Sequence, residues 1–262
     1  MKGFVWFGIV LSWVFLAASF DATAGARGKA SDLATSCNVV GFSSKTTNSY
    51  VFVGCCYESC GDEPISLEEL LGDQFTSGPN GDKVAIWDAT KQNYITYEKA
   101  RDGRFYSTSR GMHVPVDTRV PAGTALWLIR KNPDSVIVLT GAIPVQAAIT
   151  NALVGATNYP SNMICYPYPV KVSVQDFINT SHGAQANDDP KKADKLTLWN
   201  ARGEPDVRLG LKGDGKWHEL NGWAANAPST RMIEVSEGAC FQAGKPITWV
   251  VRRPVSFEVF DR

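Results

Sequence analysis

Few residues in this chain could carry chemistry, and their spacing matches no known catalytic arrangement. The three histidines, His113, His182 and His218, have no partner at a recognisable spacing, which a catalytic histidine needs. The sequence contains no G-x-S-x-G hydrolase turn, no H-E-x-x-H zinc helix and no glycine-rich phosphate loop. We therefore expect a protein that is not an enzyme, with no catalytic residues, no metal site and no cofactor.

Two carboxylates, Asp82 and Asp88, lie six residues apart on one expected strand and would face one side of a sheet. Most glycoside hydrolases use a pair of carboxylates as their catalytic groups. The matching positions 112 residues later hold Asp194 and Asn200, so the second acid is lost there. We interpret these side chains as hydrogen-bonding groups of turns and strand ends, and residues 187–190 as a solvated loop rather than a calcium site.

The first 24 residues have the layout of a secretory signal peptide. Lys2 gives a positive start, residues 4–18 carry no charge, and Ala22-Thr23-Ala24 fits a cleavage site after Ala24. The uncharged run is shorter than the roughly 20 residues that cross a bilayer, and no later apolar stretch is long enough. The chain has 26 basic and 26 acidic residues and no basic stripe, so nucleic acid is not an expected partner. We expect a secreted or cell-envelope protein with no transmembrane segment after cleavage.

The cysteines all follow this leader, and an even number of cysteines in an exported chain is typical of disulfides. A metal site through Cys56 and Cys60 lacks a second ligand pair at zinc-like spacing. Six cysteines allow fifteen pairings. We expect Cys165 to pair with Cys240, because both lie on strands of the C-terminal half, and the other four to supply the remaining bridges. The disulfide candidates are Cys37, Cys55, Cys56, Cys60, Cys165 and Cys240.

The chain repeats itself. Residues 82–89 (DKVAIWDA) match residues 194–201 (DKLTLWNA), and residues 102–105 (DGRF) match 214–217 (DGKW), both 112 residues apart. Two separate blocks with one offset indicate a duplication, which should be sought before any other fold assignment. Two flanking blocks match with shifted offsets: 66–71 with 173–178 at 107, and 120–126 with 235–241 at 115.

Each copy reads as a mainly β module with one short helix. Ser66 and Ser173 begin the helices as N-caps, each with an acidic residue three positions on. Short strands at this spacing favour a β-sandwich or an open barrel. We therefore predict a signal peptide at 1–24, repeat module 1 at 37–141, a linker at 142–160 and repeat module 2 at 161–253.

These motifs resemble a group of exported repeat proteins known mainly from Verrucomicrobia. The likeness is carried by residues 40–42 (VGF), 86–88 (IWD), 123–127 (GTALW), 136–141 (VIVLTG) and 166–169 (YPYP). It spans nearly all of residues 37–253, and its motifs are strand and turn residues. The resemblance implies an uncharacterised surface or envelope protein. Many members carry a C-terminal sorting helix, whereas this chain ends in FEVFDR.

Tryptophans offer the one route to a ligand. Trp87 and Trp199 occupy matching positions, so we expect them in a common core. Trp217 and Trp223 belong to the second copy, and exposed indole rings bind sugars by stacking. Two functions follow: a structural or display protein of the envelope, or a carbohydrate-binding module that uses Trp217 and Trp223. Its partners would be envelope or extracellular polysaccharide, or other surface proteins.

Overall fold

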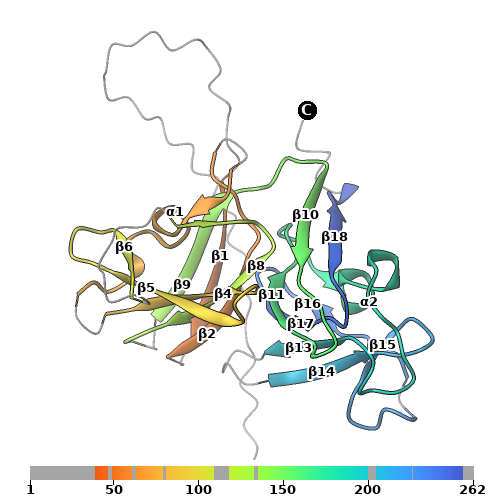
Figure 1. The fold of residues 1–262 in the computed structure, drawn as a ribbon. Helices are drawn as coiled ribbons and strands as arrows, with labels where there is room; N and C mark the ends of the chain where they lie inside the picture. Colours follow the sequence, from red (N-terminus) through yellow and green to blue (C-terminus); the bar gives the residue numbers. More distant parts are fainter. Residues whose placement is uncertain are drawn as a thin grey trace, which may run out of the picture. The chain divides into compact units, whose positions relative to one another are not determined.

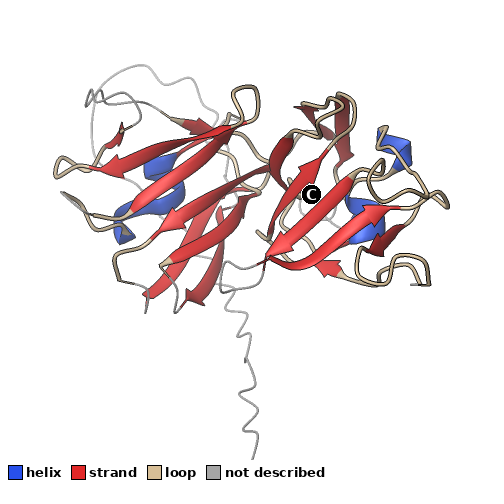
Figure 2. Cartoon of the chain, turned by 60° about the horizontal axis from the view of Figure 1, so that its bottom comes forward, coloured by secondary structure: helices blue, strands red, loops and turns tan. Residues whose placement is uncertain are grey.

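The computed structural model describes residues 39–46, 49–60, 63–78, 81–108, 118–132, 135–199, 205–225 and 227–255, and these are mainly β (Figures 1 and 2). The N-terminal half contains β1 (Val39–Thr46), β2 (Tyr50–Cys55), β3 (Ile65–Ser66), α1 (Leu67–Leu71), the 3-10 turn η1 (Gly72–Gln74), β4 (Lys83–Asp88), β5 (Asn93–Lys99), β6 (Phe105–Ser107), β7 (Arg119–Val120), β8 (Thr124–Ile129) and β9 (Ser135–Ala142). The C-terminal half contains β10 (Ala148–Leu153), β11 (Ser161–Cys165), β12 (Val172–Ser173), α2 (Val174–Phe177), η2 (Thr180–His182), β13 (Lys195–Trp199), β14 (Pro205–Leu211), β15 (Trp217–Glu219), β16 (Met232–Ile233), β17 (Gly238–Gln242) and β18 (Ile247–Arg252).

One large antiparallel sheet runs through both halves in the order β15-β14-β13-β17-β11-β8-β4-β5-β6, with β2 also paired to β8. Four two-stranded sheets accompany it, formed by β1-β9, β3-β7, β10-β18 and β12-β16. Each half has its own cluster of buried apolar side chains, to which its short helix contributes. The helices lie behind the large sheet, one with each half (Figure 2).

The order and pairing of elements in the N-terminal half recur in the C-terminal half. In each half the first strand pairs with the ninth, the second with the eighth, the third with the seventh, and the fourth with the fifth and eighth. The register recurs too, because Lys83 stands opposite Ile129 and Lys195 stands opposite Gln242. Ile129 and Gln242 are therefore equivalent and lie 113 residues apart.

This register corrects one block of the sequence alignment. An offset of 113 makes Gly123 equivalent to Ser236, and Ala125 equivalent to Gly238, whereas the offset of 115 had matched Gly123 with Gly238. The backbone agrees with the correction, since Gly123 has φ 96° and Ser236 has φ 57°. The alignment followed the glycine, but the C-terminal half fills the same left-handed position with a serine, which adopts it at some cost.

Helix starts follow the sequence expectation more closely. Ser66 and Glu69 form a full capping box around α1, with both hydrogen bonds at 3.1 Å. Ser173 caps α2 through the backbone N–H of Gln175 at 3.2 Å, without a returning bond from Asp176. No helix of the described ranges is long and apolar enough to cross a membrane.

The expected linker at 142–160 contains a strand. β10 lies within it and pairs along its whole length with β18, opposite residues 247–252. The strand is hard to see in the sequence because its exposed positions are filled by alanine and threonine, and the polar Asn151 takes one of its half-buried positions. The expected signal peptide, residues 1–24, lies outside the described residues.

Candidate functional site

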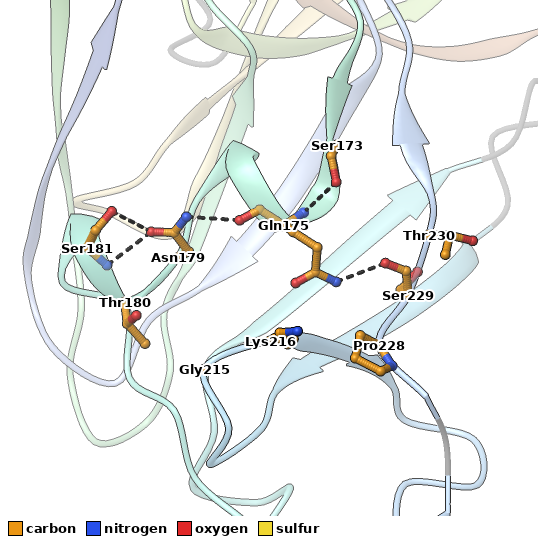
Figure 3. A pocket seen from close by; sticks show the side chains of 10 residues that line it. All are labelled: Ser173, Gln175, Asn179, Thr180, Ser181, Gly215, Lys216, Pro228, Ser229 and Thr230. Atoms are coloured by element: carbon orange, nitrogen blue, oxygen red, sulfur yellow. Dashed lines mark hydrogen bonds between the residues drawn. The ribbon is translucent and has the colours of Figure 1, made fainter.

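A hollow with a volume of about 670 Å³ forms an open groove in the C-terminal half (Figure 3). It lies between α2 and η2 on one side and the start of β15 with residues 228–230 on the other. Its lining is rich in hydroxyl and amide groups: Ser173, Gln175, Asn179, Thr180, Ser181, Gly215, Lys216, Pro228, Ser229 and Thr230. A second hollow of about 420 Å³ adjoins it and shares residues 228–230.

Gln175 fixes the walls of this groove. Its side-chain oxygen accepts the N–H of Trp217 at 2.9 Å, and its side-chain nitrogen donates to the carbonyls of Trp217 at 3.1 Å and Ser229 at 2.9 Å. Asn179 adds a bond from its side-chain nitrogen to the Gln175 carbonyl at 2.9 Å, and its Oδ1 accepts from Ser181. These amides hold three chain segments together (Figure 3).

Three groups of the groove face solvent without a hydrogen bond to the rest of the described chain: the side chains of Thr180, Lys216 and Thr230. None of the lining residues is a histidine, cysteine, aspartate or glutamate, and Lys216 is the one charged side chain among them. What the lining can do is hydrogen-bond a ligand that carries hydroxyl or anionic groups. Sequence reasoning missed this groove, because its two polar clusters, 179–181 and 228–230, are far apart in the chain.

The expected sugar-stacking pair does not form. Trp217 is fully buried, and its indole N–H donates to the carbonyl of Ile178 at 2.6 Å. Trp223 is half-buried, donates to the carbonyl of Asp188 at 2.8 Å and packs its ring on Gly210. The carbohydrate-binding alternative required an exposed Trp217 and fails for this residue, since a side chain with no accessible surface cannot stack on a sugar. The signal was in the repeat itself: Trp217 matches Phe105, which is also fully buried.

The matched tryptophans are not in the core of their own halves. Trp87 and Trp199 are both half-buried on the large sheet. The indole N–H of Trp87 donates to the carbonyl of Ser161 in the other half at 2.7 Å. The ring of Trp199 lies 4.7 Å from that of Phe52 and 6.0 Å from that of Trp127, again across the halves. Both tryptophans belong to the contact between the halves.

Asp82 serves the backbone, as the sequence indicated. It is fully buried, and its carboxylate accepts the N–H groups of Thr76 at 2.7 Å and Lys131 at 2.5 Å. Nε of Arg130 lies 3.4 Å away and balances its charge. Asp88 accepts the N–H groups of two turn residues and is paired with Lys91 at 2.6 Å, which lowers its pKa.

Asp194 repeats this arrangement in the second half. It is fully buried and accepts the N–H groups of Gln185 at 2.7 Å and Gly244 at 2.8 Å. Burial raises the pKa of the Asp194 carboxyl, although the two backbone donors oppose the shift. Each half therefore has a buried aspartate that ties the loop before its Trp-bearing strand to the turn after its eighth strand.

The histidines are structural where they are described. Nδ1 of His182 accepts the N–H of Asn179 at 3.2 Å, and burial lowers the pKa of His182. Nε2 of His218 lies 2.9 Å from Oδ2 of Asp214, in the turn before β15. His113 lies outside the described residues.

Four of the disulfide candidates are free buried thiols: Cys55, Cys56, Cys165 and Cys240. The expected bridge between Cys165 and Cys240 is wrong. The two residues lie on adjacent strands but two places out of register, since Cys165 stands opposite Gly238. Cys165 instead donates to the carbonyl of Cys55 at 3.2 Å. Cys60 is not among the free thiols, and Cys37 lies outside the described residues.

Burial controls the chemistry of these thiols. It raises the pKa of Cys55 to about 12 and that of Cys56 to about 11, and it also raises the pKa values of Cys165 and Cys240. The thiolate is the reactive form, so these groups are inert at neutral pH. The described residues contain no cluster of three or more side chains that could hold a metal ion.

Comparison of this chain with protein-family models, with curated proteins and with solved structures gave no match.

Proposed function

We propose that this protein is an exported, non-catalytic component of the cell envelope or surface. Its mature chain would be two copies of one β-sandwich-like or open-barrel-like module, which act as packing and display units. The observation that carries the proposal is that polar side chains at equivalent positions of the two halves make equivalent structural bonds. Groups that could do chemistry are thereby occupied in maintaining the fold.

The buried aspartates Asp82 and Asp194 are one such pair, and the helices provide another. Glu68 of α1 accepts the N–H of Phe105 at 3.0 Å, as Gln175 of α2 accepts that of Trp217. A carboxylate and an amide do the same work here, so the shared role needs an acceptor oxygen and not an acid.

The turn before the sixth strand provides a third pair. Asp102 accepts the N–H of Arg104 at 3.1 Å and the hydroxyl of Tyr106 at 2.6 Å. Asp214 accepts the N–H of Lys216 at 3.0 Å and contacts His218, which stands where the first half has a tyrosine. This equivalence supports a structural role for His218, because tyrosine replaces it without loss of the bond.

Fractionation of cells that make the full chain tests the proposal. We expect the mature protein to begin at Gly25 by mass spectrometry and to be recovered from the envelope or the medium. Crosslinking on intact cells should then join it to envelope polymers or surface proteins. Recovery of the uncleaved chain from the cytoplasm would contradict export, and a chemical reaction abolished by a single polar substitution in the groove would contradict the absence of catalysis.

A second candidate function is binding of a glycan in the groove, favoured by its hydroxyl and amide lining. The partner would be bound by hydrogen bonds from Thr180, Thr230 and Lys216, without aromatic stacking. Lys216→Ala combined with Thr180→Val should abolish retention on insoluble polysaccharide without lowering the melting temperature. Trp223→Ala, which leaves the groove intact, is the matched control. Retention that survives the double change would exclude this site.

A further inference from the structure

The two halves meet through the same backbone contacts on both sides of the joint. The second strand of each half reaches the start of the eighth strand of the other: Val53 pairs with Glu237, and Ile164 pairs with Thr124. In the shared register Val53 is equivalent to Ile164, because they stand opposite the equivalent residues Leu126 and Ala239. The two bridges therefore join equivalent residues, once on each side of the joint.

The hydrogen bonds beside these bridges repeat in the same way. The N–H of Gly54 donates to the carbonyl of Ser236 at 2.8 Å, and the N–H of Cys165 donates to the carbonyl of Gly123 at 2.9 Å. Gly54 is equivalent to Cys165, and Ser236 to Gly123, by the same register. Contacts that exchange equivalent residues define an isologous interface, the kind that forms around a two-fold axis.

Gly54 and Cys165 face each other across this axis. A Cβ added to Gly54 would lie 2.7 Å from Sγ of Cys165 and closer still to its Cβ. At an isologous interface a residue near the axis meets its own equivalent. Here the two equivalents differ in size, and the space suits only one side chain.

We propose that the joint is an isologous interface whose selectivity comes from the unlike pair Gly54 and Cys165. The inference rests on the proposed duplication. Each half fits the unlike half as its partner. Two C-terminal halves would bring two Cys165 side chains into a space that holds one, and two N-terminal halves would leave that space empty.

Aromatic side chains around the axis supply the apolar area of the joint. Phe52 lies between Trp127 of its own half and Trp199 of the other, with both ring centroids at 4.7 Å. It also fills the space that a side chain at Gly238 would need, since a Cβ there would lie 2.6 Å from the Phe52 ring. Gln92 adds a reciprocal pair of hydrogen bonds to the backbone of Ser161, at 2.8 and 3.0 Å.

Exchanging the two axis residues in the full chain tests the proposal. Gly54→Ala should raise the unfolding equilibrium constant by about tenfold or more, because it overpacks the axis. The exchange Gly54→Cys with Cys165→Gly should return that constant to within about threefold of the wild type. If Gly54→Ala does not fold, the exchanged chain is compared with the wild type directly. An exchanged chain that stays more than about tenfold less stable than the wild type would overturn the two-fold relation.

Gly141→Ala is the matched control. A Cβ at Gly141 would lie 2.6 Å from Cβ of Tyr57 and 2.8 Å from Cδ1 of Ile65, so it would crowd side chains of the N-terminal half and not Cys165. It should destabilise the chain, and Cys165→Gly should not rescue it. Rescue of Gly141→Ala by Cys165→Gly would show a general relaxation and would contradict the proposal.

Selectivity is measured on the full chain with a protease site inserted after Val145, which is exposed between β9 and β10. After cleavage, native mass spectrometry should show one N-terminal and one C-terminal fragment held together. Separated fragments, or pairs of like fragments, would overturn the proposal. These measurements report association and stability, whereas fractionation reports export. A failure of the interface proposal can therefore be told apart from a failure of the proposed envelope function.

Discussion

Replacement of Trp217 separates a core residue from a ligand platform. Trp217→Ala removes a fully buried indole, and such truncations cost about 3–5 kcal/mol. It also leaves the buried carbonyl of Ile178 without its 2.6 Å partner, which costs about 1–3 kcal/mol more when no water replaces it. The two costs overlap, so we expect a loss of about 4 kcal/mol or more. For a chain of this size that corresponds to a fall in melting temperature of roughly 10 °C.

Urea unfolding followed by circular dichroism measures this loss, with two comparison variants. Trp217→Phe installs the ring that the first half has at this position, and should cost only about 1–2 kcal/mol for the lost hydrogen bond and smaller volume. Trp223→Ala removes a half-buried ring and should cost about 1 kcal/mol. If Trp217→Ala unfolds within about 1 kcal/mol of the wild type and loses binding to insoluble polysaccharide, the core assignment is refuted.

Three further predictions concern the thiols, a strained turn and a buried acid. Iodoacetamide at pH 8 should label none of the four buried thiols in the folded chain and all four after unfolding, because burial raises their pKa values; they are Cys55, Cys56, Cys165 and Cys240. Labelling of the native protein within minutes would contradict this prediction. Ser236→Gly should be more stable than Ser236→Ala by about 0.5–1 kcal/mol in urea unfolding, since both changes remove the hydroxyl that contacts Sγ of Cys56 and only glycine relieves the strain at φ 57°; equal stabilities would contradict this. The raised pKa of Asp194 contributes stability that is fully present below the unfolded-state pKa of 3.8 and is lost as pH rises through the folded-state pKa. In urea titrations the stability of Asp194→Asn relative to the wild type should therefore increase with pH. A difference that does not change with pH would refute this prediction.

Local patterns predicted local structure well in this chain. The Ser66 capping box and the strand between Asp82 and Asp88 each depend on residues a few positions apart, and each lies where the sequence placed it. β10 was missed because pairing with β18, and not an apolar pattern, makes it a strand. The alignment of Gly123 failed for a similar reason: the backbone requires a left-handed residue at that place, and the second half meets the requirement with serine.

The candidate site was beyond prediction for a different reason. Its lining comes from three segments, residues 173–181, 215–216 and 228–230, brought together by Gln175 and its bonds to Trp217 and Ser229. None of these bonds produces a residue spacing that can be recognised in the sequence. The expected bridge between Cys165 and Cys240 failed because it assumed only that both residues lie on strands of the same half, whereas a bridge needs two side chains close together, and Cys165 lies opposite a glycine.

A residue matched between two copies has two structural explanations, and the sequence does not separate them. It can fill the core that each copy has, or it can lie in the joint that both copies share. Trp87 and Trp199 were assigned to the first class and belong to the second, because each reaches the second strand of the other half. Partial exposure distinguishes the classes: the matched pair Phe105 and Trp217 is fully buried, whereas Trp87 and Trp199 are not. A tryptophan repeated at an internal offset is therefore evidence for an interface between the copies as much as for a core within them.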